Sequence, residues 1–232
     1  MRIRAITFDL DDTLWPFAPV AARIETALRA WLTEQAPRTA ARFDRDAAFA
    51  LLIALRDELP ELANRPGELR REALRRMLVA SGDDPKLADP GLAVVLQARQ
   101  QVDLYPEVTN AMDRLAARFP LLALTNGNAD LELTGVAHWF CDIVSASRTG
   151  FGKPDTRIFH LACDRLGFAP AEVLHVGDNL EVDVAGALEA GMQAAWIHRE
   201  LDGEAPPGAL RFADVAALAD ALEDDRVLLS PR

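Results

Sequence analysis

Four short polar segments of this sequence contain side chains that could together perform hydrolytic chemistry. Each follows, directly or after a short loop, an apolar run that is typical of a buried strand. The segments are Asp9-Leu10-Asp11-Asp12-Thr13, Thr125-Asn126-Gly127-Asn128, Gly152-Lys153-Pro154 and Gly177-Asp178-Asn179, and Asp183 lies five residues after Asp178. Because the carboxyl ends of parallel strands share one edge of a sheet, where ligands bind, we expect these side chains to converge there.

The carboxylates in these segments favour a bound cation. Several carboxylates held close together repel one another and raise one another's pKa unless a cation lies among them. A small set of hard oxygen ligands suits Mg²⁺, which commonly keeps some of its waters and takes a substrate phosphate oxygen as a further ligand. The sequence therefore predicts a Mg²⁺ site at this edge of the sheet.

The same segments contain the groups that phosphoryl transfer needs. Lys153 and the Thr125 hydroxyl beside Mg²⁺ would form a phosphate cradle, and Gly127 would let the backbone approach the anion closely. Asp9 could attack phosphorus and form an aspartyl-phosphate. Asp11, two residues on, lies on the same side of an extended chain and could protonate the leaving alcohol and then activate water. Each segment alone is a weak signal, because acids after strands often cap helices or turns. Their joint occurrence in order is a strong one.

The elements that must position these segments alternate between strand and helix. Apolar runs predict strands at 3–8, 121–125, 142–145, 173–177 and 193–197, and helical patterns at 111–119, 156–166 and 182–190 separate them. Residues 199–208, which end in Pro206-Pro207-Gly208, predict a loop. This alternation predicts an α/β fold with a doubly wound, Rossmann-like parallel sheet.

A long helical stretch interrupts this alternation after the first strand. Helices are predicted from an apolar stripe between residues 20 and 32 that ends at Pro37, from Asp44 to Pro60, from Pro66 to Gly82, and from Gly91 to Val102. We expect a helical cap domain, residues 15–104, inserted into an α/β core formed by residues 1–14 and 105–232. Such an insertion implies a lid that excludes water during the first chemical step and that selects the substrate.

Composition narrows the classes of partner. The 232 residues carry a formal net charge of −11, which disfavours binding to nucleic acid or to an anionic membrane surface. The two cysteines, Cys141 and Cys163, have no metal-type spacing, and free thiols in a reducing compartment are expected. Neither a signal-peptide pattern nor a long apolar run occurs, so we expect a cytoplasmic protein. The expected partner is a small phosphomonoester substrate, and both a monomer and a homodimer remain open.

On these motifs the sequence resembles the haloacid dehalogenase superfamily, in the phosphatase branch whose helical cap follows the first motif. DLDDTL (9–14) resembles the first motif, TNG (125–127) the second, GKP (152–154) the third and GDNLEVDVAGALEAGM (177–192) the fourth. Within the superfamily, TNGNA, GKP and HVGD with GMQAAWI look most like phosphatases of flavin mononucleotide and of 5-amino-6-(5-phospho-D-ribitylamino)uracil. The resemblance covers essentially the whole chain and is weakest in the cap.

The resemblance implies a role for each motif residue. Asp9 would be the nucleophile and a Mg²⁺ ligand, and Asp11 the general acid and base, with its backbone carbonyl on the metal. Asp178 would complete the metal site, and Asp183 would bind the metal or hold another of its ligands. For the phosphoryl group, Thr125 and the Asn126 amide would hold it beside Gly127, and Lys153 would neutralise both it and Asp9.

Two other functions compete with a phosphatase. A 2-haloacid dehalogenase of the same superfamily also uses an aspartate nucleophile, but on carbon and without a metal. The dehalogenases that this sequence resembles lack an acid at the position of Asp11, so Asp11 and Asp178 together argue against that activity. A non-catalytic, phospho-accepting or binding module is the third alternative. Receiver modules of that kind are about half this length and have no helical insertion.

Several other residues have both a structural and a functional interpretation. Trp15 could stack on a flat substrate ring or serve packing at the entry to the cap. Asp12 and His175 are expected to be structural, bonded to nearby backbone and satisfied in the core respectively. The cluster Arg70, Arg71, Arg75 and Arg76 is expected to form a solvated face paired with acids, although one of these arginines could reach an anionic substrate.

Overall fold

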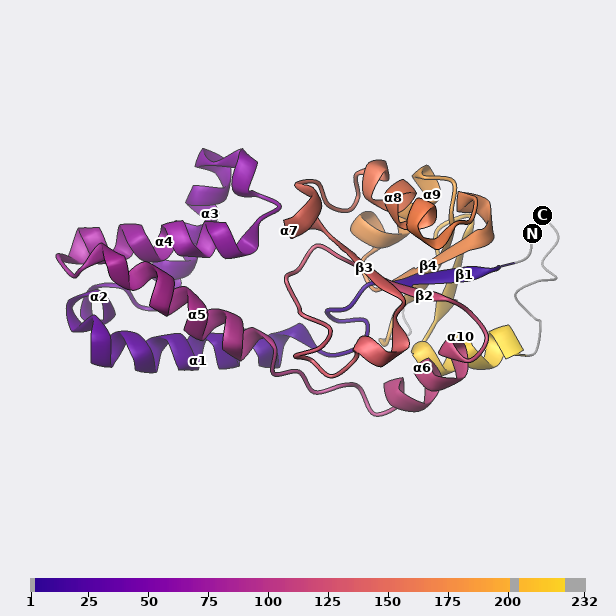
Figure 1. The fold of residues 1–232 in the computed structure, drawn as a ribbon, viewed down its shortest axis with the longest axis horizontal. Coiled ribbons are helices and arrows are strands. Elements are labelled where there is room, and N and C mark those ends of the chain that lie inside the picture. Colours follow the sequence, from indigo (N-terminus) through magenta and orange to yellow (C-terminus); the bar gives the residue numbers. More distant parts are fainter. Residues whose placement is uncertain (1–2, 201–204, 224–232) are drawn as a thin grey trace. The chain divides into compact units, whose positions relative to one another are not determined.

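The chain forms two compact units, one α/β and one helical. The computed structural model describes residues 3–200 and 205–223 (Figure 1). The α/β unit takes the chain as far as Pro16, then Asp103–Gly127, then the part from Gly135 onward. The helical unit takes Phe17–Val102 and also Asn128–Thr134. Its main junctions lie two residues from the expected boundaries, whereas the short second segment was not expected from the sequence.

A parallel six-stranded sheet forms the centre of the α/β unit. Its strands are β1 (Ala5–Phe8), β2 (Leu121–Thr125), β3 (Asp142–Ser145), β4 (Val173–Gly177), β5 (Gln193–Ile197) and β6 (Ala209–Phe212). Their order in the sheet is β3-β2-β1-β4-β5-β6, and every pair is parallel. The order reverses at β1, so the crevice beyond β1 and its neighbours is where ligands bind in such sheets. The predicted doubly wound, Rossmann-like fold is confirmed.

Helices cover both faces of this sheet, as Figure 1 shows. On one face, α8 (Thr156–Leu166) and α9 (Gly186–Glu189) share a buried core with the strands that includes Phe159, Val173 and Trp196. On the other face, α6 (Val108–Ala116) packs against α10 (Val215–Glu223). The central strands β1, β2 and β4 are fully buried and mostly apolar because both of their faces are covered.

The structure differs from the predicted α/β elements in five places. The helix expected at 111–119 is α6, which begins three residues earlier. The expected helix 182–190 is a π-helical turn, Leu180–Ala185, followed by α9. The short helix α7 (Ala146–Thr149), the strand β6 and the helix α10 were not expected from the sequence. Of the predicted loop, residues 199–200 and 205–208 lie outside helix and strand, and 201–204 fall outside the described residues.

The helical unit is built from five helices in its described residues: α1 (Phe17–Gln35), α2 (Pro37–Arg42), α3 (Arg45–Glu58), α4 (Pro66–Ser81) and α5 (Ala88–Arg99). Pro37 does not only end the first helix, because it also opens α2, where a missing N–H costs nothing. Asp44 caps α3 by accepting from the Ala47 N–H, and Gly82 ends α4 at a φ of 76°. The fourth expected helix begins at Ala88 rather than Gly91. In the described part of the chain, no helix is both long and apolar enough to cross a membrane.

Candidate active site

The ends of neighbouring strands bring acidic side chains together in the α/β unit. Asp9 directly follows β1 and Asp178 directly follows β4, while Asp183 lies in the turn after β4. One carboxylate oxygen from each of these three residues lies within 4.8 Å of the others. The convergence expected at the switch point of the sheet is therefore observed for these three carboxylates.

Lys153 inserts its ammonium between two of these acids. Its Nζ lies 2.6 Å from Asp9 Oδ1 and 2.5 Å from Asp183 Oδ1, and its side chain is only 1% exposed. Burial alone lowers the pKa of Lys153, but the charges of Asp183 and Asp9 outweigh it and raise that pKa. The lysine therefore stays charged and neutralises part of the acidic cluster.

Asp183 is held by protein donors on both carboxylate oxygens. Besides Lys153, Oδ1 accepts from His175 Nε2 at 3.1 Å, and Oδ2 accepts from the Asn179 N–H at 3.0 Å. Burial favours the neutral His175 ring and lowers its pKa, so its other nitrogen accepts from the Thr7 hydroxyl at 2.8 Å. His175 is thus the satisfied core histidine that the sequence suggested, and it anchors Asp183.

A glycine at position 177 makes room for this acid. A Cβ there would lie 2.3 Å from Asp183 Cγ and 2.5 Å from its Cβ, closer than any side chain tolerates. The Gly-Asp pair after β4 therefore has two separate purposes. Gly177 admits the Asp183 side chain, and Asp178 supplies its own carboxylate to the cluster.

The cluster has too little positive charge among its own residues. Burial, with Asp183 and Asp178 nearby, raises the pKa of Asp9 despite Lys153. Burial, followed by the charges of Asp183 and Asp12, raises the pKa of Asp178 to about 6. Asp183 alone has a lowered pKa, since Lys153 and His175 outweigh its burial. The three carboxylates cannot all ionise easily with the one charge of Lys153 among them, so a further positive charge would stabilise them. Their oxygen atoms suit a small hard cation such as Mg²⁺.

Asn126 clamps the backbone that carries the lysine. Its side-chain Nδ2 donates to the Lys153 carbonyl and its Oδ1 accepts from the Lys153 N–H, each at 2.8 Å. A Cβ at Gly152 would lie 2.6 Å from Asn126 Oδ1, so the glycine is required for this clamp. The Asn126 side chain is therefore used for positioning. Nearby, the Thr125 hydroxyl accepts from the Gly127 N–H at 2.9 Å.

Asp11 lies outside the carboxylate cluster and is held by Trp15. The indole Nε1 donates to Asp11 Oδ1 at 2.8 Å, and Trp15 is fully buried. Its ring therefore packs in the α/β unit and is not open to stack on a substrate. Asp12 adopts a φ of 60°, and its N–H donates to the Trp15 carbonyl, which closes the tight turn.

Two further hydrogen bonds hold Asp178. Thr13 Oγ1 donates to Asp178 Oδ1 at 3.3 Å, and Trp196 Nε1 donates to the Asp178 carbonyl at 2.8 Å. The contacts of Trp15, Trp196, His175 and the Asn126 side chain were not foreseen. Trp196 and the Asn126 side chain contact residues 18 and 27 positions away in the chain, so no local sequence pattern reports those contacts. Trp15 lies only four residues from Asp11, but their contact depends on the tight turn at Asp12.

The arginine cluster of α4 is mostly paired with acids, as the sequence suggested. Arg71 pairs with Asp89, Arg75 with Glu72, and Arg76 with both Glu58 and Glu72. Arg70 lines a cavity in the helical unit.

Comparison with known proteins agrees with this geometry. The family model for haloacid dehalogenase-like hydrolases matches residues 3–191. The 5-amino-6-(5-phospho-D-ribitylamino)uracil phosphatase YigB of Escherichia coli is 33% identical over 203 residues, covering 86% of this chain and 85% of that protein. A phosphoserine phosphatase of Thermus thermophilus is 33% identical, covering 95% of this chain and 100% of the relative.

A solved structure is also similar over nearly the whole chain. It is a crystal structure named as a 2-haloacid dehalogenase from Pseudomonas syringae pv. Tomato DC3000, with a TM-score of 0.89 and 36% identity, covering 96% of this chain and 99% of that one. Phosphatase and dehalogenase names thus both occur among the relatives. With its matching family model, its parallel sheet and its converging acids, this chain belongs to the haloacid dehalogenase-like hydrolase family.

Proposed function

We propose that this hydrolase is a Mg²⁺-dependent phosphomonoesterase that acts on a small phosphorylated metabolite through an aspartyl-phosphate on Asp9. The observation that supports this most is the approach of the Asp9, Asp178 and Asp183 carboxylates to within 4.8 Å, with the Lys153 ammonium on two of them. A displacement on phosphorus needs this combination of a nucleophile and concentrated positive charge. Localisation in the cytoplasm is part of the proposal.

Three acidic residues and one carbonyl would hold the metal. Asp9 and Asp178 would supply carboxylate oxygens, and Asp11 its backbone carbonyl. Asp183, whose oxygens already accept from Lys153, His175 and Asn179, would complete the site or fix the residues that do. When bound, Mg²⁺ would supply charge that stabilises the transferring phosphoryl group and keeps Asp9 ionised.

In the first step, an Asp9 carboxylate oxygen attacks phosphorus and the bond to the leaving alcohol oxygen breaks. Lys153 neutralises charge on Asp9 and on the phosphoryl oxygens. The Thr125 hydroxyl and the Asn126 backbone amide hold that phosphoryl group, and Gly127 lets the backbone approach it closely. Asp11, oriented by Trp15, gives its proton to the leaving alkoxide, which departs as the alcohol.

In the second step, water attacks the aspartyl-phosphate. Asp11, now ionised, takes a proton from the water, and the new P–O bond forms as the bond between phosphorus and Asp9 breaks. Inorganic phosphate leaves, and both Asp9 and Asp11 return to their starting states. The same side chain thus acts as acid and then as base.

For the substrate, we propose a phosphate of the riboflavin pathway or flavin mononucleotide. The motif resemblance and the name of the Escherichia coli relative support this class. Because another relative is named a phosphoserine phosphatase, other small phosphomonoesters are also tested as substrates. We further propose that the helical unit is the cap that selects among them, because the motif residues of the α/β unit deal only with phosphate and metal.

The test measures phosphate release from a panel containing flavin mononucleotide, 5-amino-6-(5-phospho-D-ribitylamino)uracil, phosphoserine, sugar phosphates and nucleoside monophosphates. Each is assayed with Mg²⁺ and with chelator. We expect release that needs Mg²⁺, that Asp9→Asn abolishes without unfolding the protein, and that Asp164→Asn on the exposed face of α8 leaves unchanged. Turnover by folded Asp9→Asn would refute the nucleophile.

A 2-haloacid dehalogenase is the second candidate, because the similar Pseudomonas structure bears that name. Asp9 would then attack the carbon that bears the halogen, halide would leave, and water would hydrolyse the resulting ester. Halide release from L-2-chloropropionate in the presence of chelator separates the two activities. Chelator-resistant halide release without phosphate release would establish the dehalogenase and exclude the phosphatase.

A further inference from the structure

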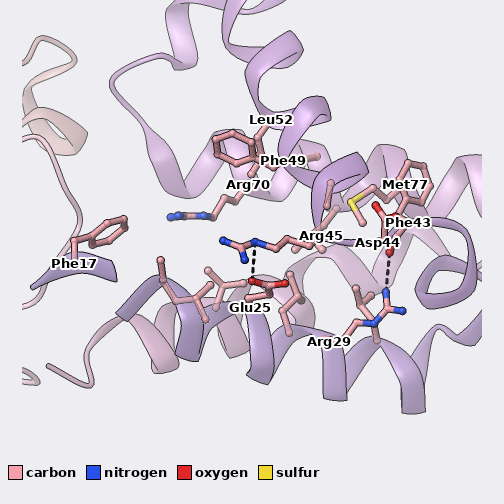
Figure 2. A pocket seen from close by; sticks show the side chains of 18 residues that line it. Phe17, Glu25, Arg29, Phe43, Asp44, Arg45, Phe49, Leu52, Arg70 and Met77 are labelled. Atoms are coloured by element: carbon pink, nitrogen blue, oxygen red, sulfur yellow. Dashed lines mark hydrogen bonds and ion pairs between the residues drawn. The ribbon is translucent and has the colours of Figure 1, made fainter. Parts of the chain in front are cut away.

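A cavity of about 300 Å³ lies wholly within the residues of the helical unit. Helix α1 forms one wall, with Ile24 and Leu28 among its lining residues, and α3 forms the opposite wall with Phe49 and Leu52. The floor comes from α4 and includes Met77. Figure 2 shows these walls, with Phe17 at one end of the cavity and Phe43 toward the other.

This cavity exists because two walls of the unit do not pack closely on each other. Helix α1 packs along α5 and α3 packs on α4, whereas α1 and α3 face each other across the cavity. Two polar links join α1 to the chain segment 43–45, where α3 begins. Arg45 Nε lies 3.1 Å from Glu25 Oε2, and Arg29 Nη1 donates to the Phe43 carbonyl at 2.7 Å (Figure 2). Apolar side chains line most of the space between the two helices.

The charged groups around the cavity favour an anion. Three arginines and two acids line it, in a chain whose formal net charge is −11. Figure 2 shows the guanidinium groups of Arg45 and Arg70 extending in the same direction, toward Phe17. Arg70 is half-buried, so its charge acts in surroundings where water screens it less.

We propose that this cavity is a binding site for a small organic anion with an apolar, ring-sized body, whose acidic group lies at Arg70. A cavity of 150 Å³ holds benzene, and ligand pockets begin at about 300 Å³, so the volume suits a body of one or two rings. Aromatic and aliphatic walls would hold that body. A guanidinium would bind a carboxylate or sulfonate through paired N–H donors. The inference concerns equilibrium binding and does not depend on the phosphatase reaction.

The test uses two fluorescent probes of nearly the same shape. Naphthalene-1-sulfonate has a two-ring apolar body and an anionic group, and naphthalene lacks the anionic group. Both are titrated into the full-length protein in chelator, so that turnover plays no part. We expect saturable binding of both probes with one site per chain, and tighter binding of the sulfonate.

Variants of the helical unit assign that binding to the cavity. Arg70→Gln should weaken binding of the sulfonate by about tenfold and leave the neutral probe unchanged. Arg70→Lys, which keeps the charge but lacks the paired donors, should weaken it by less. Ala48→Trp, which fills the cavity from α3, should abolish binding of both probes. Arg75→Gln on α4 and Ala54→Trp on the exposed side of α3 are matched controls outside the cavity and should bind as the parent does.

Two results would overturn the proposal: one-to-one binding that survives in Ala48→Trp, or an equal effect of Arg70→Gln on both probes. The comparison of the two probes with Arg70→Gln can be made even if Ala48→Trp does not fold. Kinetics then identifies the source of the natural ligand. Inhibition by the sulfonate that competes with a phosphomonoester substrate assigns the site to the organic part of that substrate. Inhibition that does not compete, or none at all, assigns it to a separate effector, and both findings support the site.

Discussion

The substitution Asp183→Asn tests whether the acidic cluster depends on one buried carboxylate. The shape of the side chain is kept, but no orientation of the amide satisfies its surroundings. Oδ1 accepts from Lys153 and His175, and Oδ2 accepts from the Asn179 N–H. An amide NH₂ placed on either side therefore faces a donor and leaves a buried N–H group unpaired.

The expected loss of stability follows from these contacts. Removing one partner of a buried ion pair costs about 3–5 kcal/mol, and the lower end applies because Lys153 keeps Asp9 at 2.6 Å. The removed charge also relieves repulsion on Asp9 and Asp178, which offsets part of the mismatch at the amide. We expect a net loss of about 3 kcal/mol, which corresponds to a fall in Tm of about 6–12 °C for a protein of this size.

Differential scanning calorimetry in chelator gives the answer without any contribution from bound metal. Asp164→Asn on the exposed part of α8 is the control for loss of one negative charge. The pKa of Asp183 is lowered in the folded state, so its stabilisation is present above the ordinary Asp pKa of about 4 and is lost as pH falls through the folded value. A loss at neutral pH below about 1 kcal/mol, the size typical of exposed pairs, would refute the reasoning.

Three further predictions follow from the site. At pH values well above 6, Mg²⁺ should raise Tm, and this increase in Tm should become smaller as the pH falls through 6. Burial raises the pKa of Asp178 to about 6, so below that pH Mg²⁺ must displace the proton of Asp178 to bind. An increase in Tm that does not change with pH in a thermal-shift series would contradict this. Asn126→Leu removes both hydrogen bonds to the Lys153 backbone, so steady-state kinetics should show kcat falling about 10²-fold with a smaller change in KM. Trp15→Phe deletes the donor to Asp11 and should lower kcat about tenfold in the same assay, whereas an unchanged kcat would exclude the orienting contact.

Much of the α/β unit could be predicted because most of its strands have a recognisable local sequence pattern. The runs that become β1, β2 and β4 are mostly apolar, since both faces of a parallel sheet are covered, and polar segments follow them at once. The approach of Asp9 to Asp178 then follows from topology. By contrast, β6 has only half-buried residues at the edge of the sheet, and its Arg211 breaks the apolar pattern, so the sequence gives little sign of a strand.

The supporting contacts of the site could not be predicted, since each depends on distances set by the whole fold. His175 reaches Asp183 only because the π-helical turn after β4 folds back over Gly177. The Asn126 side chain was expected near phosphate, yet it meets the Lys153 backbone across the two strand ends. Residue type and spacing thus indicate which groups gather, whereas the pairing of individual atoms depends on tertiary packing.

The route of the chain between its two units limits how they can be exchanged among relatives. Because Asn128–Thr134 belongs with Phe17–Val102, the chain passes from one unit to the other at four points rather than two. Within the helical unit the two segments are joined, since Gln100 Oε1 accepts from the Asp130 N–H at 2.8 Å. A chimaera that grafts only the long insertion from another family member would separate these partners. A graft that keeps this hydrogen bond must therefore carry both segments as a two-piece module.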